Sequence, residues 1–342
     1  MGRVRSDVER LPEPRCVVVT GGAGFVGSHV TQRLLAEGVA VHVVDSLVTG
    51  KRWNVPGGAL FHHLDVREPR LPALVAELSP DVVIHLAAAA DPRRSANDPL
   101  ADAQANVMGS LAVLEAVRTA PRRARVVFSS TVAIPADRGA TPSSPYSIGK
   151  LVVEKYMAAY RSKYGIVTCI LRFANVYGPR QGGYESAGVV AAFCGRLLAG
   201  EPLRIFGDGH QTRDFVHARD VADAIWRAAV RPLPADGLPL SLGSGTSITV
   251  LDLAGRLSRQ AGVPLSLEFR EPHGADVPHS VVDVTRAAAV LGWRARVRLE
   301  DGLGETLRWF ASNRASVDAL PSHTIEGRLA PAARSERGEG GL

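Results

Sequence analysis

The chain has 342 residues, of which 46% are hydrophobic, so it can bury a large core as one big domain or two small ones. Its net charge of +6 comes from arginines scattered among acidic residues, which argues against a nucleic-acid partner. No apolar run reaches membrane-spanning length and the polar start lacks a signal-peptide core, so we expect a cytoplasmic protein without a membrane partner. The three cysteines show no metal-ligand spacing, and no metal is expected.

The first chemical signal is a glycine turn between an apolar run and a helical segment. Gly21, Gly24 and Gly27 permit a tight turn, close approach of the backbone to a pyrophosphate, and close packing of helix on strand. The next apolar run, 41–45, ends at Asp45, whose carboxylate can accept hydrogen bonds from an adenosine ribose. This pattern predicts a dinucleotide site and favours NAD over NADP.

Short β-rich runs alternate with helical stretches as far as about residue 230. The runs lie at 16–20, 41–45, 60–64, 82–86, 125–128 and 167–171. Such alternation predicts an α/β fold with a doubly wound parallel sheet, the Rossmann arrangement, and a smaller lobe over the carboxyl ends of its strands. We expect a flexible arm at 1–14, an NAD-binding Rossmann domain at 15–180 to which 212–242 returns, a substrate-binding lobe from 181–211 and 243–318, and a disordered tail at 319–342.

A tyrosine and a lysine four residues apart open the next helical segment. The run is Tyr146-Ser147-Ile148-Gly149-Lys150, and this spacing places the phenol and the ammonium on one helix face. A neighbouring cation favours phenolate, so we expect Tyr146 to act as a base well below its ordinary pKa of about 10. The preceding strand ends in Ser129-Ser130-Thr131, where a hydroxyl can reach the same substrate oxygen.

Further motifs follow along the chain: Asp65-Val66, His85-Leu86-Ala87-Ala88, Asn106-Val107-Met108-Gly109, the run from Arg172 to Gln181, Gly207-Asp208-Gly209 and Arg213-Asp214-Phe215-Val216-His217. With the glycine turn and the Tyr146/Lys150 pair, the chain resembles an extended short-chain dehydrogenase/reductase of the NAD-dependent sugar-nucleotide epimerase/dehydratase family. The resemblance extends over roughly residues 15–312. It implies an enzyme similar to the UDP-glucose 4-epimerases.

The resemblance also implies which residues bind each ligand. NAD would contact Gly21, Gly24, Phe25, Val26, Gly27, Asp45, Ser46, Gly50, Asp65, Val66, Leu86, Ala87, Ala88, Asn106, Ser129, Tyr146, Lys150 and Phe173. The nucleotide-sugar substrate would contact Thr131, Tyr146, Asn175, Val190, Arg204, Phe206, Arg213, Asp276 and Ser280. Tyr146, Lys150 and Thr131 would be catalytic. The helical segment 100–118 would pack in the two-fold bundle of a homodimer, with burial inside the monomer as the alternative.

The residues after Thr131 distinguish the subgroups of this family. Members that dehydrate carry Asp-Glu there and members that decarboxylate carry a glutamate, whereas this chain has Val132-Ala133. Gly182-Gly183 stand where uronic acid enzymes usually have a basic residue, which favours a neutral hexose. We therefore expect a 4-epimerase in which Tyr146 takes the proton of the sugar 4-hydroxyl while hydride passes to NAD, and Thr131 helps to shuttle the proton.

Three departures from the family pattern leave other functions open. Only fourteen residues separate Thr131 from Tyr146, which makes a dehydratase or ketoreductase of the same family an alternative. A non-catalytic module that senses NAD or a nucleotide sugar is a second alternative. His273 replaces a usual arginine, so one diphosphate contact is weakened or passes to Arg270. Ser280 is small where hexose-only epimerases have a large side chain, so an N-acetylhexosamine also fits.

Overall fold

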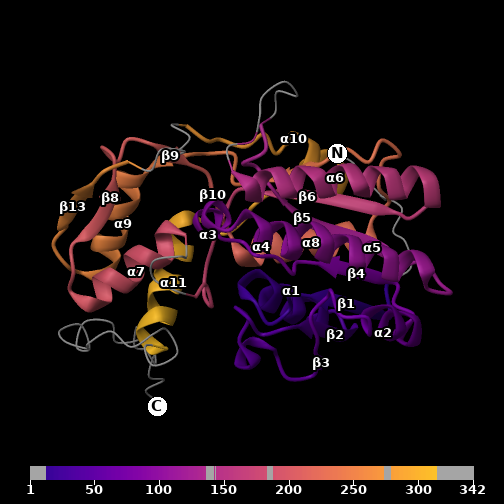
Figure 1. The fold of residues 1–342 in the computed structure, drawn as a ribbon. Coiled ribbons are helices and arrows are strands. Elements are labelled where there is room, and N and C mark those ends of the chain that lie inside the picture. Colours follow the sequence, from indigo (N-terminus) through magenta and orange to yellow (C-terminus); the bar gives the residue numbers. More distant parts are fainter. Residues whose placement is uncertain (1–12, 136–141, 143, 183–187, 273–278, 314–342) are drawn as a thin grey trace, which may run out of the picture.

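The computed structural model describes residues 13–135, 142, 144–182, 188–272 and 279–313. A seven-stranded parallel sheet lies between two layers of helices, and a smaller lobe stands at one end of it (Figure 1). The strand order is β11-β6-β5-β4-β1-β2-β3, so the winding reverses between β1 and β4. Ligands of open α/β sheets bind outside the carboxyl ends of the strands at such a point. The predicted doubly wound α/β fold is confirmed.

The strands of the large sheet coincide closely with the predicted apolar runs. They are β1 (Cys16–Thr20), β2 (Ala40–Asp45), β3 (Leu60–His63), β4 (Val82–His85), β5 (Arg125–Thr131), β6 (Thr168–Phe173) and β11 (Leu240–Leu242). Successive side chains enter opposite cores: Val17 and Val19 pack on one layer of helices and Val18 on the other. Because both faces are buried, these strands are nearly continuous apolar runs in the sequence.

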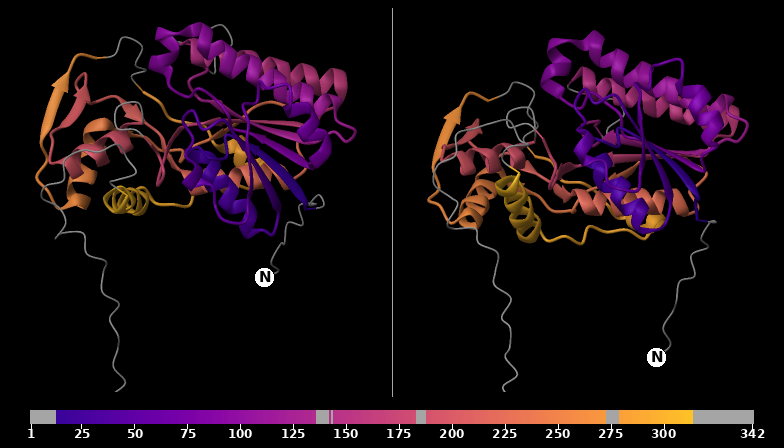
Figure 2. Two further views of the ribbon diagram at one scale, coloured as in Figure 1. Left: turned by 60° about the horizontal axis from the view of Figure 1, so that its bottom comes forward. Right: turned by 90° about the horizontal axis from the view of Figure 1, so that it is seen from below.

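Each face of the sheet has its own layer of helices (Figure 2). On one face lie α1 (Phe25–Ala36), α8 (Ala218–Val230) and α10 (Thr285–Leu291). On the other lie α2 (Leu71–Leu78), α5 (Gly109–Thr119) and α6 (Pro145–Tyr164). Helix α6 begins with a capping box between Ser144 and Ser147 and ends at Gly165, whose φ of 68° is left-handed. These two signals fix the ends of the helix that carries Tyr146 and Lys150.

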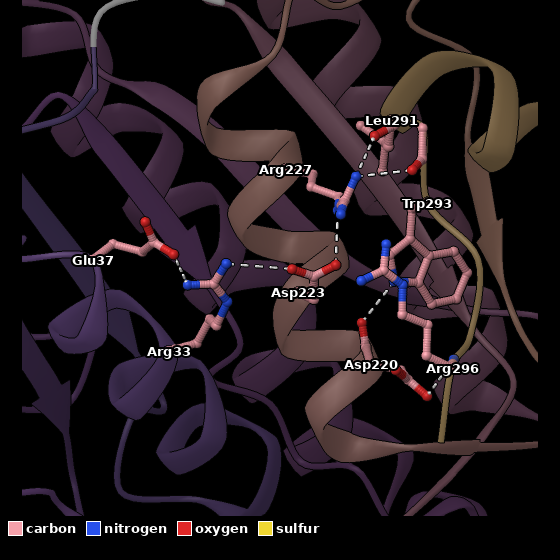
Figure 3. Close-up of polar contacts among 9 residues, drawn as sticks. Arg33, Glu37, Asp220, Asp223, Arg227, Leu291, Trp293 and Arg296 are labelled. Carbon is pink, nitrogen blue, oxygen red and sulfur yellow. Dashed lines mark hydrogen bonds and ion pairs between the residues drawn. The ribbon is translucent and has the colours of Figure 1, made fainter. Parts of the chain in front are cut away.

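Charged side chains join the helices of the first layer (Figure 3). Arg33 of α1 pairs with Asp223 of α8 at 3.4 Å. Arg227, one turn further along α8, donates to Asp223 at 2.7 Å and to the carbonyl oxygen of Gly292 at 2.8 Å. Gly292 directly follows α10. Helices α1 and α8 and the end of α10, which are distant in the sequence, are thereby joined on one side of the sheet.

The segment after α10 packs differently from the expected division of the chain. The sequence assigned all of 243–318 to the small lobe, whereas Trp293 is buried in the core of the large one. Its indole N–H donates to the carbonyl oxygen of Asp220 at 2.9 Å, and the Asp220 carboxylate accepts the backbone N–H groups of Arg296 and Val297 (Figure 3). Asp220, in the first turn of α8, thus accepts hydrogen bonds from the Trp293 side chain and from the backbone of this segment, and these bonds hold the segment on the large lobe.

The predicted helical segment 100–118 is not one continuous helix. After α3 (Pro92–Asn97), the chain forms α4 (Pro99–Ala103), a π-helical turn η2 (Gln104–Met108) and then α5. A π turn holds more residues than an α turn, so the predicted apolar face rotates along the segment. Leu100 is therefore 80% exposed, whereas Leu114 lies in the core.

The smaller lobe has a separate apolar core, formed by α7 (Val189–Ala199), β8 (Leu203–Phe206), α9 (Val250–Ala261), β13 (Leu267–Arg270) and α11 (Leu299–Ser312). The remaining elements are η1 (Arg52–Asn54), β7 (Asn175–Tyr177), β9 (Thr212–Arg213), β10 (Phe215–His217) and β12 (Ile248–Thr249). The pair β7–β10 is parallel and β9–β12 antiparallel. Within the described ranges, no helix is both long and apolar enough to cross a membrane.

Candidate active site

The glycine turn after β1 is so tightly packed that side chains do not fit. Gly21 has a φ of 71°, in the left-handed region, and its N–H donates to the carbonyl oxygen of Val44 at 2.8 Å. A Cβ on Gly21 would lie 2.6 Å from the backbone nitrogen of Ala87, and a Cβ on Gly27 would overlap the Gly21 carbonyl oxygen. The turn therefore brings bare backbone and the N-terminus of α1 to the carboxyl edge of the sheet. This is the arrangement that binds phosphate groups.

Asp45 connects this turn to the loop after β2. One of its carboxylate oxygens accepts the Ala23 N–H at 3.0 Å, and the other accepts the Leu47 N–H at 2.8 Å. Gly50 comes so close that a Cβ there would lie 2.7 Å from Asp45 Oδ1. A carboxylate has about four acceptor sites, so after these two bonds Asp45 can still accept ribose hydroxyls. The neighbouring Ser46 belongs to the same loop.

The other residues expected at the cofactor follow neighbouring strands. Asp65 and Val66 come after β3, and the Asp65 carboxylate accepts two hydrogen bonds from the Arg67 guanidinium, at 2.9 and 2.7 Å. These bonds hold the pKa of Asp65 below its ordinary value. After β4, the Asn106 side chain makes two hydrogen bonds to the backbone of Ala89, at 2.9 and 3.0 Å. Asn106 thereby fixes the loop that contains the remaining expected contacts Leu86, Ala87 and Ala88.

Lys150 reaches from α6 to the end of β5. Its Nζ donates to the Ser129 carbonyl oxygen at 2.9 Å and lies 5.8 Å from the centre of the Tyr146 ring. The ammonium also lies 4.7 Å from the centre of the Phe128 ring. Burial lowers the pKa of Lys150 to about 8, and the charges of two carboxylates oppose that effect. The structure thus places the predicted phenol and ammonium together.

The expectation of a depressed pKa at Tyr146 is wrong for the chain as described. Burial raises the pKa of Tyr146 to about 12, and the negative charge of Asp102 adds to that effect. The physical reason is that the half-buried phenol has lost solvent, while the Lys150 ammonium is bonded to Ser129 rather than to the phenol oxygen. Desolvation outweighs the attraction of the neighbouring cation.

The three hydroxyls at the end of β5 have different environments. Ser129 donates to the carbonyl oxygen of His85 at 3.2 Å, and the buried Ser130 donates to the carboxylate of Glu154 at 2.6 Å. Thr131, at the last position of the strand, accepts the Ala133 N–H at 3.1 Å. In this contact the Thr131 hydroxyl is the acceptor, so its hydrogen takes no part in the bond. Thr131 is therefore the hydroxyl best placed to donate to a ligand.

The residues expected at the substrate come from several elements near the small lobe. Asn175 lies on β7, Arg204 and Phe206 on β8, and Arg213 on β9. The Ser280 N–H donates to the Thr212 carbonyl oxygen at 3.2 Å, which places Ser280 beside the residue that precedes Arg213. Arg204 donates to Glu268 at 3.0 Å. Asp276 and His273 lie outside the described residues.

The resemblance implies that Val190 contacts the substrate, but its side chain is not accessible to a ligand. It is 1% exposed and belongs to the apolar core of the small lobe. It stands in the first turn of α7, where backbone N–H groups lack carbonyl partners within the helix. A contact from Val190 would therefore come from its backbone.

Sequence reasoning missed a buried ion pair beside this site. Arg172 of β6 donates to both carboxylate oxygens of Glu154, at 2.8 and 2.7 Å. Glu154 also accepts the Ser130 hydroxyl and is 5% exposed. The signal was its spacing: Glu154 follows Lys150 by four residues, so both lie on the face of α6 that meets the sheet. The pair fixes α6 against β5 and β6.

His85 is a buried histidine with a hydrogen-bonding partner at each ring nitrogen. Its two ring nitrogens lie 2.7 Å from the Thr20 hydroxyl and 3.0 Å from the Ser110 hydroxyl. Burial lowers the pKa of His85 to about 3, so the ring is neutral. Among the described residues, no group of three His, Cys, Asp or Glu side chains could hold a metal ion.

Comparison with known proteins assigns the chain to a family. The model of the NAD dependent epimerase/dehydratase family matches residues 17–236. The chain belongs to this family. It is an NAD-dependent enzyme, and the resemblance inferred from the sequence is confirmed. The glycine turn, the N-terminus of α1 and Asp45 form a cradle that fits NAD, because side chains at Gly21 or Gly27 would fill it.

Similar members of the family extend over nearly the same length. A UDP-glucose 4-epimerase of Mycolicibacterium smegmatis is 39% identical over 308 residues, covering 86% of this chain and 97% of that protein. The structure of UDP-glucose 4-epimerase from Thermotoga maritima with UDP-glucose has a TM-score of 0.82 and 36% identity, covering 87% and 99% of the two chains. That of Thermus thermophilus UDP-glucose 4-epimerase with NAD has a TM-score of 0.80 and 35% identity, covering 86% and 99%.

Proposed function

We propose that this chain is a nucleotide-sugar 4-epimerase that acts on a UDP-hexose or a UDP-N-acetylhexosamine by transient oxidation at C4. One observation carries the proposal: Tyr146, Lys150 and the end of β5 meet at the carboxyl edge of the sheet that also bears the glycine turn. Val132 stands where dehydratases and decarboxylases of the family have an acid. The similarity to UDP-glucose 4-epimerases gives further support.

The proposed reaction needs one proton and one hydride to leave the sugar and return. NAD, when bound, would accept the hydride from C4 and give it back, and it adds a positive charge to the site. Tyr146 takes the proton of the sugar 4-hydroxyl and later returns it. The Lys150 ammonium and the positive charge of bound NAD would favour the phenolate form of Tyr146, against the burial that raises the pKa of Tyr146 in the chain alone. Thr131 relays the proton, since its hydroxyl hydrogen is available for a ligand oxygen.

The substrate side of the proposal depends on Ser280. This residue is half-buried and bonded to Thr212, the neighbour of Arg213, whose guanidinium suits a diphosphate. A serine occupies little volume, so the C2 substituent of the sugar has room to be an acetamido group. We therefore propose that the sugar pocket admits N-acetylhexosamines as well as neutral hexoses.

A panel of nucleotide sugars tests this function. The holoenzyme is incubated with UDP-, dTDP-, GDP- and CDP-sugars, and the products are identified by NMR. We expect 4-epimers of the UDP-sugars, with kcat/KM for UDP-N-acetylglucosamine within about tenfold of that for UDP-glucose. The Ser280→Tyr variant should lose the acetamido substrate selectively, because its ring fills the space at C2. If Ser280→Tyr slows both sugars equally, the pocket assignment is wrong.

The short connection between Thr131 and Tyr146 supports a second candidate function, that of a dehydratase or ketoreductase of the same family. It has fourteen residues, and 136–141 and 143 lie outside the described residues. A dehydratase would release water from the sugar, and a ketoreductase would consume exchangeable reduced cofactor. A sensor would retain NAD and turn over none of the sugars. The same NMR panel, with absorbance of the reduced cofactor, separates these outcomes from epimerisation.

We also propose that two copies of the chain form a homodimer. Apolar side chains are exposed on the packed elements α4, η2 and α6, namely those of Leu100, Met108, Ile148 and Tyr156. A second copy would bury these residues in a two-fold helical bundle. Light scattering after gel filtration should give a mass of about twice 36.3 kDa, and Leu100→Glu with Tyr156→Glu should give a folded monomer. A monomeric wild-type chain would contradict this assignment.

A further inference from the structure

A buried carboxylate packs against α6, the helix that carries Tyr146 and Lys150. Asp102 of α4 is 3% exposed. A Cβ placed on Gly149 would lie 3.5 Å from Asp102 Oδ2, so the carboxylate faces α6 at the residue that precedes Lys150. At this distance the carboxylate would be in van der Waals contact with a Cβ at position 149. Asp102 belongs to neither the expected cofactor contacts nor the expected substrate contacts.

The polar groups beside the Asp102 carboxylate, the Asn106 amide and the Ser95 hydroxyl, are neutral. Asn106 Nδ2 donates to Asp102 Oδ1 at 2.8 Å, across the start of the π-helical turn. None of the ion pairs among the described residues includes Asp102. A buried carboxylate without a directly bonded cation depends on the nearest buried positive charge to remain ionised.

Glu154, the other buried carboxylate near Lys150, differs in this respect. Arg172 donates to both of its oxygens, at 2.8 and 2.7 Å, so its charge is already balanced. Among the described residues, the Lys150 ammonium donates to one acceptor, the neutral carbonyl oxygen of Ser129. Asp102 and Lys150 are thus a buried anion and a buried cation, each with a neutral hydrogen-bonding partner. Electrostatics makes them counter-ions even without a direct bond.

The charge of Asp102 acts on both members of the proposed catalytic pair in one direction. It raises the pKa of Lys150 against the opposing effect of burial, because it stabilises the ammonium. It also raises the pKa of Tyr146, because it disfavours the phenolate. Removing this charge should therefore make both groups release their protons at lower pH. A change in packing alone would not move both in the same direction.

Other charged groups near Lys150 do not substitute for Asp102. From α6, Glu154 also raises the pKa of Lys150, by less than Asp102 does, and its carboxylate is bonded to Arg172 of β6. From β4, His85 is neutral because burial lowers its pKa to about 3. On α3 and before α4, Arg94 and Asp98 are exposed to solvent, which screens their charges.

We propose that Asp102 is a positioning residue whose buried charge is the counter-ion of Lys150 and sets the pH range in which the Tyr146–Lys150 pair is active. The proposal rests on the catalytic roles proposed for Tyr146 and Lys150. In this proposal Asp102 contacts neither the substrate nor the cofactor, and it acts through Tyr146 and Lys150.

Titration of Lys150 in the NAD-bound protein tests this directly. The chain has only four lysines, at positions 51, 150, 155 and 163, so lysine labelled with ¹³C at Cε gives a simple NMR spectrum. Lys150→Arg identifies the Lys150 signal. We expect Asp102→Asn, which keeps an acceptor for Asn106, to lower the titration midpoint of Lys150 by about one pH unit. Asp98→Asn is the matched control, since it removes an exposed charge at the N-cap of the same helix and retains a capping side chain.

Activity provides the second readout. Both limbs of the pH dependence of kcat/KM should move to lower pH in Asp102→Asn, by a similar amount, and stay in place in Asp98→Asn. An unchanged Lys150 midpoint in folded Asp102→Asn overturns the proposal, and so does a loss of activity that is equal at every pH. If Asp102→Asn lowers the Lys150 midpoint but the wild type epimerises no sugar, Asp102 is the counter-ion of Lys150 and the proposed function is wrong. If Asp102→Asn fails to fold, Asp102→Ser takes its place in both measurements.

Discussion

Tyr146→Phe should lower the turnover of the epimerised nucleotide sugar at least about a hundredfold while the protein remains folded. The substitution removes one oxygen and keeps the ring, so the packing at the start of α6 is preserved. Phenylalanine has no group that can accept the 4-hydroxyl proton. The rate is measured at saturating sugar by NMR, and folding by circular dichroism and by calorimetric binding of NAD.

The matched control is Tyr156→Phe on the same helix. Tyr156 is 40% exposed and lies away from the end of β5, so losing its hydroxyl should leave turnover within about twofold. Turnover in Tyr146→Phe close to that of Tyr156→Phe would contradict the assignment of the base. A fall in NAD affinity with unchanged turnover would instead make Tyr146 a cofactor contact.

Local patterns in the sequence were sufficient to predict the large sheet and the glycine turn. Strands β1 and β2 are nearly continuous valine runs, as buried parallel strands are, and Gly21 and Gly27 stand where backbone packing leaves no room for a side chain. The four-residue spacing of Tyr146 and Lys150 was equally direct, because α-helix geometry brings such residues to one face. These features depend on neighbours in the chain.

Features that depend on distant parts of the chain were not predictable in this way. The π-helical turn η2 interrupts a helical pattern that reads as continuous, and its Asn106 makes hydrogen bonds to Ala89, seventeen residues away. The pKa of Tyr146 depends on burial by several elements together with the charge of Asp102, so its spacing from Lys150 alone gave the wrong direction. Trp293 packs in the core of the large lobe, where the carbonyl of Asp220, far away in the sequence, accepts its indole N–H.

Glu154→Ala should lower the free energy of unfolding by about 3–5 kcal/mol, a large part of the stability of an ordinary domain. The substitution leaves the Arg172 guanidinium, whose side chain is 18% exposed, without its two carboxylate acceptors, and leaves the buried Ser130 hydroxyl without its partner. Stranded polar groups cost far more than the pair itself contributes. Urea unfolding of the NAD-free variant and wild type, at equal protein concentration, measures the difference.

Two further variants show whether the cost comes from the stranded charge. Glu154→Leu combined with Arg172→Met removes both charges and fills similar volume, so it should recover most of the loss. Glu305→Ala breaks the more exposed pair with Arg219 and should change the stability by less than about 1 kcal/mol. A cost for Glu154→Ala as small as that of Glu305→Ala would mean that solvent or rearrangement satisfies Arg172. A double variant no more stable than Glu154→Ala would assign the loss to a cavity, and the ion pair would then not be what fixes α6 against β5 and β6.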